Sequence, residues 1–537
     1  MNKITIVGSG ASGVHFADSL LDLGYEVRMI DVGYSGPEPV MKDATFNQLK
    51  DKLEDPVNYF LGENFESVIP SDSSEVYEFP PNKKFVFKIP PGYKTSLKGF
   101  APHLSFAKGG LAEAWTGGSY PFNDSDLEDF PFNYKDIEPF YELIAKKIGI
   151  IGVEDDLSRF FPIHKNLLPP MNLDENSQIL SDEYEKKFKN RDKNRDVFLG
   201  RSRIATLSED IDERKKCDYS GRCQWGCPSD SLYVPSITLK KLLKNRNFTY
   251  FPDYLVKNFN YSSGKKIVSL SAINILTGEY REFPVEVLVL AAGTIATSKI
   301  YLDSILKKSG KRVKLYGLMD NRQILAPIIN LRMLGKQFNP ETYQYHQLAT
   351  GIQTENPKEY IHGQITTLKT GLMQPPFQSM PVDFRTAIFL GRYLHSALGV
   401  VNINFHDFRR RDNYITLSEK SVDGETILEI NYLPPAGEKE RINFSLKKFR
   451  KFFKKIGVIM PLFQAQSRPM GASVHYSGTI PMSEKGSELT VNPNCRSNDF
   501  HNLYIADGST FPFLPSKNIT FTLMANAARI VESEFNK

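Results

Sequence analysis

The sequence predicts an α/β protein, in which a doubly wound, dinucleotide-binding sheet is joined to a second domain with a mostly antiparallel sheet. Three observations predict this fold class. A strand, a glycine-rich turn and a helix open the chain within Lys3–Gly33. A buried strand that ends in Ala-Ala-Gly at Gly293 is followed by a helical segment. Many short strand-like segments lie between Val313 and Pro461. Strands that alternate with helices predict a parallel sheet, and a run of consecutive strands predicts an antiparallel one.

The first stretch has the order of a nucleotide-binding βαβ unit. Ile4–Val7 is a short apolar run, Val14–Leu23 has helical periodicity, and Glu26–Ile30 predicts a second strand that ends at Asp31. Three glycines in G-x-G-x-x-G spacing lie between the first strand and the helix: Gly8, Gly10 and Gly13. Because all parts come in order, we expect a Rossmann-type dinucleotide site here; the pattern does not separate NAD from FAD.

Each glycine has a physical task in such a site. Gly8 permits the tight turn, Gly10 lets the backbone approach a pyrophosphate, and Gly13 lets helix and strand pack closely. The helix N-terminus offers free N–H groups and a partial positive charge to the phosphates. Asp31 has the spacing at which a carboxylate accepts a hydrogen bond from a ribose hydroxyl.

Size and charge limit the classes of function. The 537 residues have room for two or more domains, and the net charge of +5 is small for this length. No basic stripe is interleaved with aromatic residues, so a nucleic-acid partner is not expected. No apolar run approaches the roughly 20 residues that span a bilayer. No signal peptide precedes the first strand, so we expect a cytoplasmic protein without a transmembrane segment.

The segment after the first βαβ unit is irregular. Tyr34–Phe100 is rich in Pro and Gly, has strand-like alternation near Lys84–Ile89, and reads as a long connection, with a lid or partner surface as the alternative. In Ala107–Pro121, two glycine pairs bracket Trp115 and Thr116. Such a segment fits backbone that closely approaches a flat or charged ligand, or a pair of tight turns.

Three of the four cysteines are clustered in the sequence. Cys217, Cys223 and Cys227 follow C-x5-C-x3-C spacing and precede a proline. The residues leave two interpretations open, namely three reduced thiols in a loop or three thiolates that ligate an iron–sulfur cluster. A zinc site would need a fourth ligand, and no histidine lies nearby.

The second domain ends in an amphipathic helix. Ser445–Ile456 places Leu446, Phe449, Phe452, Phe453 and Ile456 on one face, and lysines and arginines occupy the rest. We expect this face to pack on a core, with a membrane surface as the alternative. Lys186–Arg195 is a charge run that we expect to be solvated.

The C-terminal stretch places polar residues around a last crossover. A strand at Leu503–Ala506 runs into Asp507 and Gly508, and Asn518 precedes the final helix. His475 lies earlier, in a turn of small residues. Four segments together resemble a known protein family. In chain order they are GSGASG with Asp31, LAEAWTGGSYPFNDSDLEDF, VLVLAAGTIATSKIYLDS, and VHYSGTIPM followed by NLYIADGSTFPFLPSKNITFTLMANAARI.

With these segments the chain resembles the glucose–methanol–choline (GMC) flavoprotein oxidoreductases, nearest in appearance to their sugar and sugar-acid dehydrogenases and pyranose-oxidase-like members. The resemblance implies FAD as cofactor and His475 as catalytic base with Asn518 as its partner. Ala114 stands where some sugar oxidases of the family have a histidine that binds the flavin covalently, so the resemblance implies non-covalent FAD. It also implies a set of cofactor-binding residues: Gly8, Gly10, Ser12, Gly13, Asp31, Gly110, Trp115, Thr116, Gly117, Gly118, Val256, Ala292, Gly293, Asp507, Gly508 and Asn518.

The implied chemistry is oxidation of the CH–OH group of a sugar, polyol or related alcohol to a carbonyl, with hydride transfer to flavin N5. Two alternatives remain, a non-redox lyase or isomerase on the same scaffold and a flavin-stabilised interaction subunit. The cysteine spacing is similar to that of family members that hold a 3Fe-4S cluster. Such a cluster would imply a cytochrome partner; without it, oxygen or a soluble acceptor is expected.

The resemblance also divides the chain. The FAD-binding domain would be discontinuous and take residues 1–135, 201–313 and 466–537. The substrate domain would take residues 136–200 and 314–465.

Overall fold

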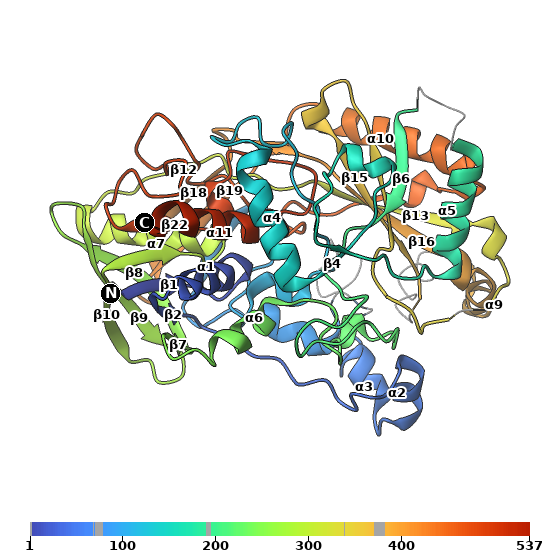
Figure 1. Cartoon of the computed structure of the whole chain (residues 1–537), viewed down its shortest axis with the longest axis horizontal. Coiled ribbons are helices and arrows are strands. Elements are labelled where there is room, and N and C mark those ends of the chain that lie inside the picture. The colour runs from blue at the N-terminus through green and yellow to red at the C-terminus, as the bar shows by residue number, and fades with distance from the viewer. Residues whose placement is uncertain are drawn as a thin grey trace.

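The computed structural model describes residues 3–67, 69, 79–188, 195–337, 339–369 and 382–536. Figure 1 shows a nucleotide-binding sheet at one end of the molecule and a larger antiparallel sheet at the other, with α4 (Tyr134–Ile148) between them. The predicted mixed α/β fold class is confirmed.

A five-stranded parallel sheet forms the first half. Its strands, in spatial order, are β22 (Leu503–Ile505), β11 (Val287–Leu290), β1 (Lys3–Val7), β2 (Glu26–Ile30) and β7 (Phe248–Phe251). Val7 pairs with Ile30 on one side and Leu290 on the other, so the carboxyl ends of the central strands lie level. The strands read as apolar runs because helices and a second sheet enclose them.

The helices of this half begin at the carboxyl edge of the sheet. α1 (Ala11–Asp22) follows β1, α7 (Thr294–Ser309) follows β11, and α11 (Thr520–Phe535) follows the turn after β22. α11 packs between α1 and α4. A capping box between Asn133 and Asp136 begins α4, which satisfies two of the unpaired N–H groups at a helix start.

An antiparallel sheet forms the second half. Its strands, in spatial order, are β20 (Val458–Ile459), β13 (Gln323–Asn330), β16 (Leu398–Asn404), β15 (Ile361–Thr367), β14 (Leu348–Ile352) and β6 (Val197–Arg201), and β21 (Gln466–Ser467) also pairs with β13. The mostly antiparallel character predicted for 313–461 is therefore observed.

The two faces of this sheet differ. Ile361 and Ile365 share a buried core with Phe449 of α10 (Glu438–Lys455). Because side chains alternate along a strand, His362 and Gln364 lie on the opposite face. Gln364 reaches Asn518 from there, so the polar face of β15 looks toward the nucleotide-binding half.

The remaining helices and strands complete the chain that the structure describes. They are α2 (Phe46–Lys52), α3 (Pro56–Leu61), α5 (Glu175–Phe188), α6 (Pro235–Leu242), α9 (Phe384–Leu394), β3 (Lys94–Lys98), β4 (Ile150–Ile151), β5 (Leu167–Leu168), β8 (Tyr254–Tyr261), β9 (Ile267–Asn274), β10 (Tyr280–Pro284), β12 (Leu315–Tyr316), β17 (Asp407–Phe408), β18 (Tyr414–Val422), β19 (Glu425–Asn431) and β23 (Phe513–Leu514).

Three local predictions have clear outcomes. The core packing of the amphipathic face in Ser445–Ile456 is confirmed, because Phe449 and Phe453 are fully buried. The strand-like alternation near Lys84–Ile89 was misleading, since Pro81–Phe87 forms a 3-10 helix that begins at a proline. Most of the charge run 186–195 lies outside the described residues, which omit 189–194.

Two further points concern the whole chain. Among the described residues, no helix has the length and apolar character needed to cross a membrane. The proposed division into two domains stays a prediction. We note that α4, just inside the segment assigned to the substrate domain, buries Tyr141 and Ile144 in the core of the first sheet.

Candidate functional site

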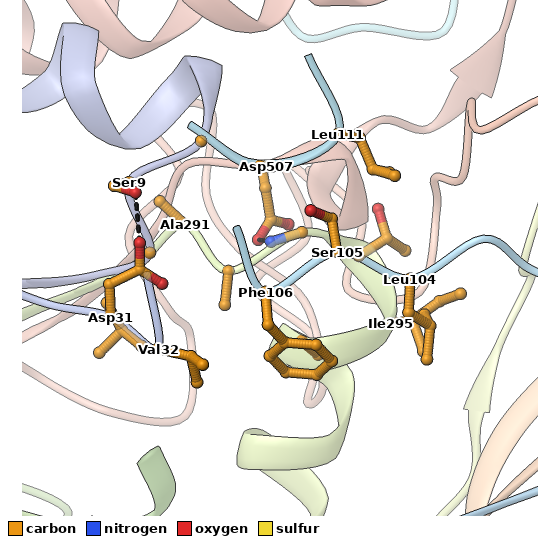
Figure 2. A pocket seen from close by; sticks show the side chains of 18 of the residues that line it. Ser9, Asp31, Val32, Leu104, Ser105, Phe106, Leu111, Ala291, Ile295 and Asp507 are labelled. Atoms are coloured by element: carbon orange, nitrogen blue, oxygen red, sulfur yellow. Dashed lines mark hydrogen bonds between the residues drawn. The ribbon is translucent and has the colours of Figure 1, made fainter. Parts of the chain in front are cut away.

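The main cavity opens at the carboxyl ends of β1 and β11 (Figure 2). The strand order reverses between these two strands, and ligands of doubly wound sheets bind at such a point. The cavity contains about 1370 Å³ of empty space including its open mouth. Its lining runs from Asp31 at the end of β2 to Asp507 and Gly508 after β22, along the sheet edge where dinucleotides bind in doubly wound folds.

Three helix N-termini border the cavity. Gly10, Gly293 and Ile519 are the residues that precede α1, α7 and α11, and none of these helices has a side-chain cap. All three residues line the cavity. Uncapped helix N-termini present free N–H groups and a partial positive charge. Their convergence suits a ligand with a pyrophosphate, as FAD has.

The glycines of the first turn have the geometry that the spacing predicts. Gly8 has a φ of +99°, and an added Cβ would lie 2.6 Å from the carbonyl oxygen of Ala291. At Gly13 an added Cβ would lie 2.1 Å from the carbonyl oxygen of Gly8. At Gly10 an added Cβ would meet no atom within 4 Å, so the space beside Gly10 belongs to the cavity.

Asp31 lies at the end of β2 and lines the same cavity. Its carboxylate accepts a hydrogen bond from the Ser9 hydroxyl, as Figure 2 shows, and another from the Tyr250 hydroxyl at 3.4 Å. Ser9 Oγ in turn accepts the backbone N–H of Gly109 at 3.0 Å. Burial raises the pKa of Asp31 to about 6 despite these hydrogen bonds. A polar ligand that donates to this carboxylate would favour its charged form.

Asp507 also lines the cavity, but protein groups use both its oxygens. Oδ2 accepts from the Gly293 backbone N–H at 3.0 Å and from the Thr297 hydroxyl at 2.5 Å. Oδ1 accepts from the backbone and side chain of Ser509 at 3.1 and 2.6 Å. The side chain therefore holds the start of α7 against the turn after β22.

The predicted cofactor residues fall into two groups. Ten line the cavity, namely Gly8, Gly10, Ser12, Asp31, Gly110, Val256, Ala292, Gly293, Asp507 and Gly508. The others, Gly13, Trp115, Thr116, Gly117, Gly118 and Asn518, do not line it. Gly118 instead faces the second part of the site, because an added Cβ would lie 3.0 Å from Asn518 Oδ1 and 3.1 Å from Gln364 Nε2.

The Trp-Thr segment is held from several sides. Trp115 Nε1 donates to the carbonyl of Tyr233 at 2.7 Å, and the carbonyl of Thr116 accepts from the Tyr343 hydroxyl at 3.3 Å. Gly117 has a φ of +74°. These contacts fix the segment between the cavity and the pair formed by His475 and Asn518.

His475 and Asn518 lie side by side, as the resemblance implies. His475 Nε2 is 3.4 Å from Asn518 Nδ2, and His475 Nδ1 is 2.9 Å from Asn321 Oδ1. The ring is buried, and burial lowers the pKa of His475 to about 4. The imidazole is therefore neutral at pH 7 and carries a free lone pair, as a proton acceptor requires.

The loop before His475 is strained and firmly held. Val474 has a φ of +62°, which is rare for a β-branched residue. Asp320 accepts hydrogen bonds from the backbone N–H of Gly471 at 2.6 Å and from the Ser473 hydroxyl. Strain of this kind persists only where surrounding contacts enforce it, and it clusters at functional sites.

Sequence reasoning missed two residues of this site. Asn321 contacts His475, and Gln364 Nε2 donates to Asn518 Oδ1 at 2.6 Å. A signal for Gln364 was present, because polar residues alternate with apolar ones along β15 (His362, Gln364 and Thr366). Asn321 lies in the irregular segment just before β13 and carries no such signal.

The candidate iron–sulfur site is not supported. Among the described residues, which include all three clustered cysteines, no three His, Cys, Asp or Glu side chains are grouped to hold a metal ion. Burial raises the pKa of Cys217 to about 12 and raises that of the Cys223 thiol well above its ordinary value.

Comparison with known proteins supports the same class. Residues 409–527, which include His475 and Asn518, match the family model described as GMC oxidoreductase. Paromamine 6'-oxidase of Streptomyces fradiae is 20% identical over 551 residues, covering 98% of this chain and 90% of that protein.

Solved structures share the fold. Pyridoxine 4-oxidase from Mesorbium loti superposes with a TM-score of 0.61 at 14% identity, and the match covers 100% of both chains. A formate oxidase variant from Aspergillus oryzae has a TM-score of 0.61 at 13% identity and covers 100% of this chain and 99% of its own. An FAD-dependent oxidoreductase from Chaetomium thermophilum has a TM-score of 0.59 at 14% identity, with 100% of both chains covered.

The fold, the cavity and the family match all agree with a flavin-dependent oxidoreductase. Residues 409–527 are similar to the GMC oxidoreductase family model, and the predicted resemblance to that family is confirmed. The predicted enzyme class, an FAD-dependent oxidoreductase of the GMC type, is confirmed with it.

Proposed function

We propose that this protein oxidises the CH–OH group of a small sugar, polyol or related alcohol to a carbonyl, with His475 as the catalytic base. The observation that carries the proposal is the buried, neutral His475 ring, 3.4 Å from Asn518 and beside the glycine segment at Gly118. The amino sugar and pyridoxine named for two of the similar oxidases bear alcohol groups, which agrees with this substrate class.

The residues that would hold FAD are those that line the main cavity. The uncapped N-termini of α1 and α7 would bind the pyrophosphate, and Asp31 would accept from a ribose hydroxyl. When bound, FAD supplies the two-electron acceptor for the hydrogen of the alcohol carbon. Ala114 offers no nucleophile to the flavin, so we propose a non-covalent cofactor.

The protein's own part in the reaction is proton transfer and orientation. His475 Nε2 accepts the hydroxyl proton of the substrate. Asn518 Nδ2 donates a hydrogen bond to the same oxygen and stabilises the negative charge that grows on it. Because the site is buried, this charge is poorly screened and the single donor has a large effect.

The electron acceptor is a separate question. A cytochrome partner was expected only if the protein held an iron–sulfur cluster, and that cluster is not supported. We propose oxygen or a soluble acceptor, which agrees with the oxidases among the similar proteins.

Anaerobic mixing of the FAD-loaded protein with candidate alcohols tests the proposal. Bleaching of the flavin absorption by a sugar or polyol, followed by recovery on admission of oxygen, is the expected result. Turnover of a substrate without any bleaching would instead identify a lyase or isomerase and overturn the proposal.

A further inference from the structure

We infer that two amide side chains, Asn321 and Gln364, set the direction of the hydrogen bonds through His475 and Asn518 and act as positioning residues. The four side chains form one chain of contacts in the order Asn321, His475, Asn518 and Gln364, which we call the amide chain. The inference rests on the proposed function only in treating His475 as the base.

Asn321 has one possible orientation. Its Nδ2 donates to the carbonyl of Phe405 at 2.7 Å and to the carbonyl of Pro515 at 2.9 Å. Asn321 is fully buried, and a carbonyl left there without a donor is costly. A flipped amide would also bring Asn321 Oδ1 against two carbonyl oxygens. Nδ2 therefore faces the two carbonyls, and Oδ1 faces His475.

The orientation of Asn321 decides which nitrogen of His475 carries the proton. Asn321 Oδ1 can only accept, and His475 Nδ1 lies 2.9 Å from it. Nδ1 must therefore be the N–H of the neutral ring, because each neutral imidazole has one donor and one acceptor. The lone pair is left on Nε2, the atom that faces Asn518.

The same logic continues to the other end of the amide chain. A lone pair on His475 Nε2 calls for a donor, so Asn518 turns its Nδ2 toward the ring and its Oδ1 away from it. Asn518 Oδ1 then accepts from Gln364 Nε2 at 2.6 Å. Gln364 thus holds the Asn518 amide in the orientation that offers an N–H beside the basic nitrogen.

If every hydrogen bond in the amide chain pointed the opposite way, only the contact between His475 and Asn321 would be unfavourable. If Gln364 and Asn518 were both flipped, each would still have a partner, and His475 would need its proton on Nε2. That ring would then present a lone pair to Asn321 Oδ1, and two acceptors would face each other at 2.9 Å. The fixed amide of Asn321 therefore excludes the arrangement in which His475 carries its proton on Nε2 and cannot act as the base.

The protonation site can be measured without any substrate. We would record ¹⁵N magic-angle-spinning NMR spectra of FAD-loaded enzyme with labelled histidine, and assign His475 by its loss in His475→Gln. The expected ring has its proton on Nδ1 and a lone pair on Nε2. A proton on Nε2 in the wild-type enzyme would overturn the inference. If the spectra agree and no alcohol is oxidised, the proposed function fails while this inference stands.

Variants then test each end of the amide chain. In Asn321→Leu the acceptor is lost, and we expect part of the His475 population to move its proton to Nε2. An unchanged spectrum would contradict the role of Asn321. In Asn321→Asp a protonated carboxyl can donate to the carbonyl of Phe405 or Pro515 while its other oxygen accepts from His475 Nδ1, so the Nδ1–H form should return. Failure of Asp to restore that form would equally count against it.

Gln364→Glu separates positioning from structure. The protonated carboxyl can still donate to Asn518 Oδ1, whereas the ionised carboxylate repels that oxygen and favours the flipped amide. We expect kcat to fall about five- to tenfold as pH rises through the carboxyl's titration, with a smaller change in KM. Gln178→Glu, an exposed site on α5, is the matched control and should show no such pH dependence. A pH-independent kcat in Gln364→Glu would overturn the role of Gln364.

Discussion

The buried carboxylate of Asp320 accepts a hydrogen bond from the Ser473 hydroxyl, and so ties the irregular segment before β13 to the loop that carries His475. Ser473 Oγ also accepts the backbone N–H of His475 at 3.0 Å. Burial raises the pKa of Asp320 to about 7. The position of the proposed base thus depends on a carboxyl group whose folded form prefers to keep its proton.

This relationship predicts a pH dependence of stability. Because the pKa of Asp320 is raised in the folded state, the unfolded state loses its proton first as pH rises. The contribution of Asp320 is therefore fully present below about pH 4 and is lost as pH rises through about 7. Asp320→Asn should flatten the dependence of the free energy of unfolding on pH in this range, with a slope difference of up to about 1.4 kcal/mol per pH unit. Chemical unfolding between pH 4 and 8 measures it.

An unchanged slope in Asp320→Asn would show that Asp320 is ionised throughout this range. The exposed Asp182→Asn on α5 is the control, since that carboxyl lies in solvent. Its unfolding curves should follow those of the wild type at every pH.

Removal of the proposed base should cost most of the turnover. His475→Ala is expected to lower kcat by about 10²–10⁴-fold, because the variant lacks the proposed acceptor of the hydroxyl proton. FAD content should stay near that of the wild type, since His475 does not line the cavity. Stopped-flow reduction of the bound flavin separates loss of chemistry from loss of cofactor. Near-normal reduction in a variant that retains FAD would remove His475 from the mechanism.

The pH profile of kcat/KM reports the same residue. Burial lowers the pKa of His475 to about 4, so the base stays unprotonated well below neutral pH. We expect the acid limb of the profile near pH 4 rather than near the ordinary histidine value of about 6.5. The stability of the fold sets the lowest pH at which the profile can be measured. As pH falls from about 6.5 to 4, the histidine is protonated first in the unfolded state, so the free energy of unfolding decreases. An acid limb near pH 6.5 in folded enzyme would mean that water reaches the ring.

The cysteine loop gives a prediction about composition. Purified protein should show flavin absorption and no stoichiometric iron, because Cys217, Cys223 and Cys227, all within the described part of the chain, are not grouped to hold a metal ion. Cys217→Ser should retain FAD and turnover. Iron and sulfide assays on anaerobically prepared enzyme measure this, and about three irons per chain would restore the cluster and the search for a cytochrome.

Residues whose role depends on local spacing could be predicted from the sequence. Residues that reach the site through long-range packing could not. Gly8, Gly13 and Asp31 could be placed because their tasks arise within one βαβ unit, where spacing decides geometry. His475 and Asn518 were found through a recognisable signature. Asn321 and Gln364 each lie 154 residues from their partner. Only the packing of the antiparallel sheet on the nucleotide-binding half brings them there, and no periodicity encodes that contact.

The misread segment at Pro81–Phe87 has a similar cause. Alternation of apolar and charged residues favours a strand, but a proline at the first position starts a helix equally well. The short 3-10 helix packs against the Gly110–Ala114 turn. The contact between these two 3-10 helices favours the helical start at the proline over the strand that the alternation predicts.

The glycine turn offers a final prediction that separates folding from cofactor binding. Gly8→Ala should destabilise the protein by more than about 1 kcal/mol, because its φ of +99° and the carbonyl of Ala291 leave no room for a Cβ. Gly10→Ala should leave the apoprotein's stability nearly unchanged, because no atom lies within 4 Å of the added Cβ. The same methyl group would enter the space beside the N-terminus of α1, where the pyrophosphate is expected, so FAD affinity should fall. Thermal unfolding of apoprotein and fluorescence titration with FAD measure the two effects. Tight FAD binding by Gly10→Ala would show that the cofactor does not approach this turn.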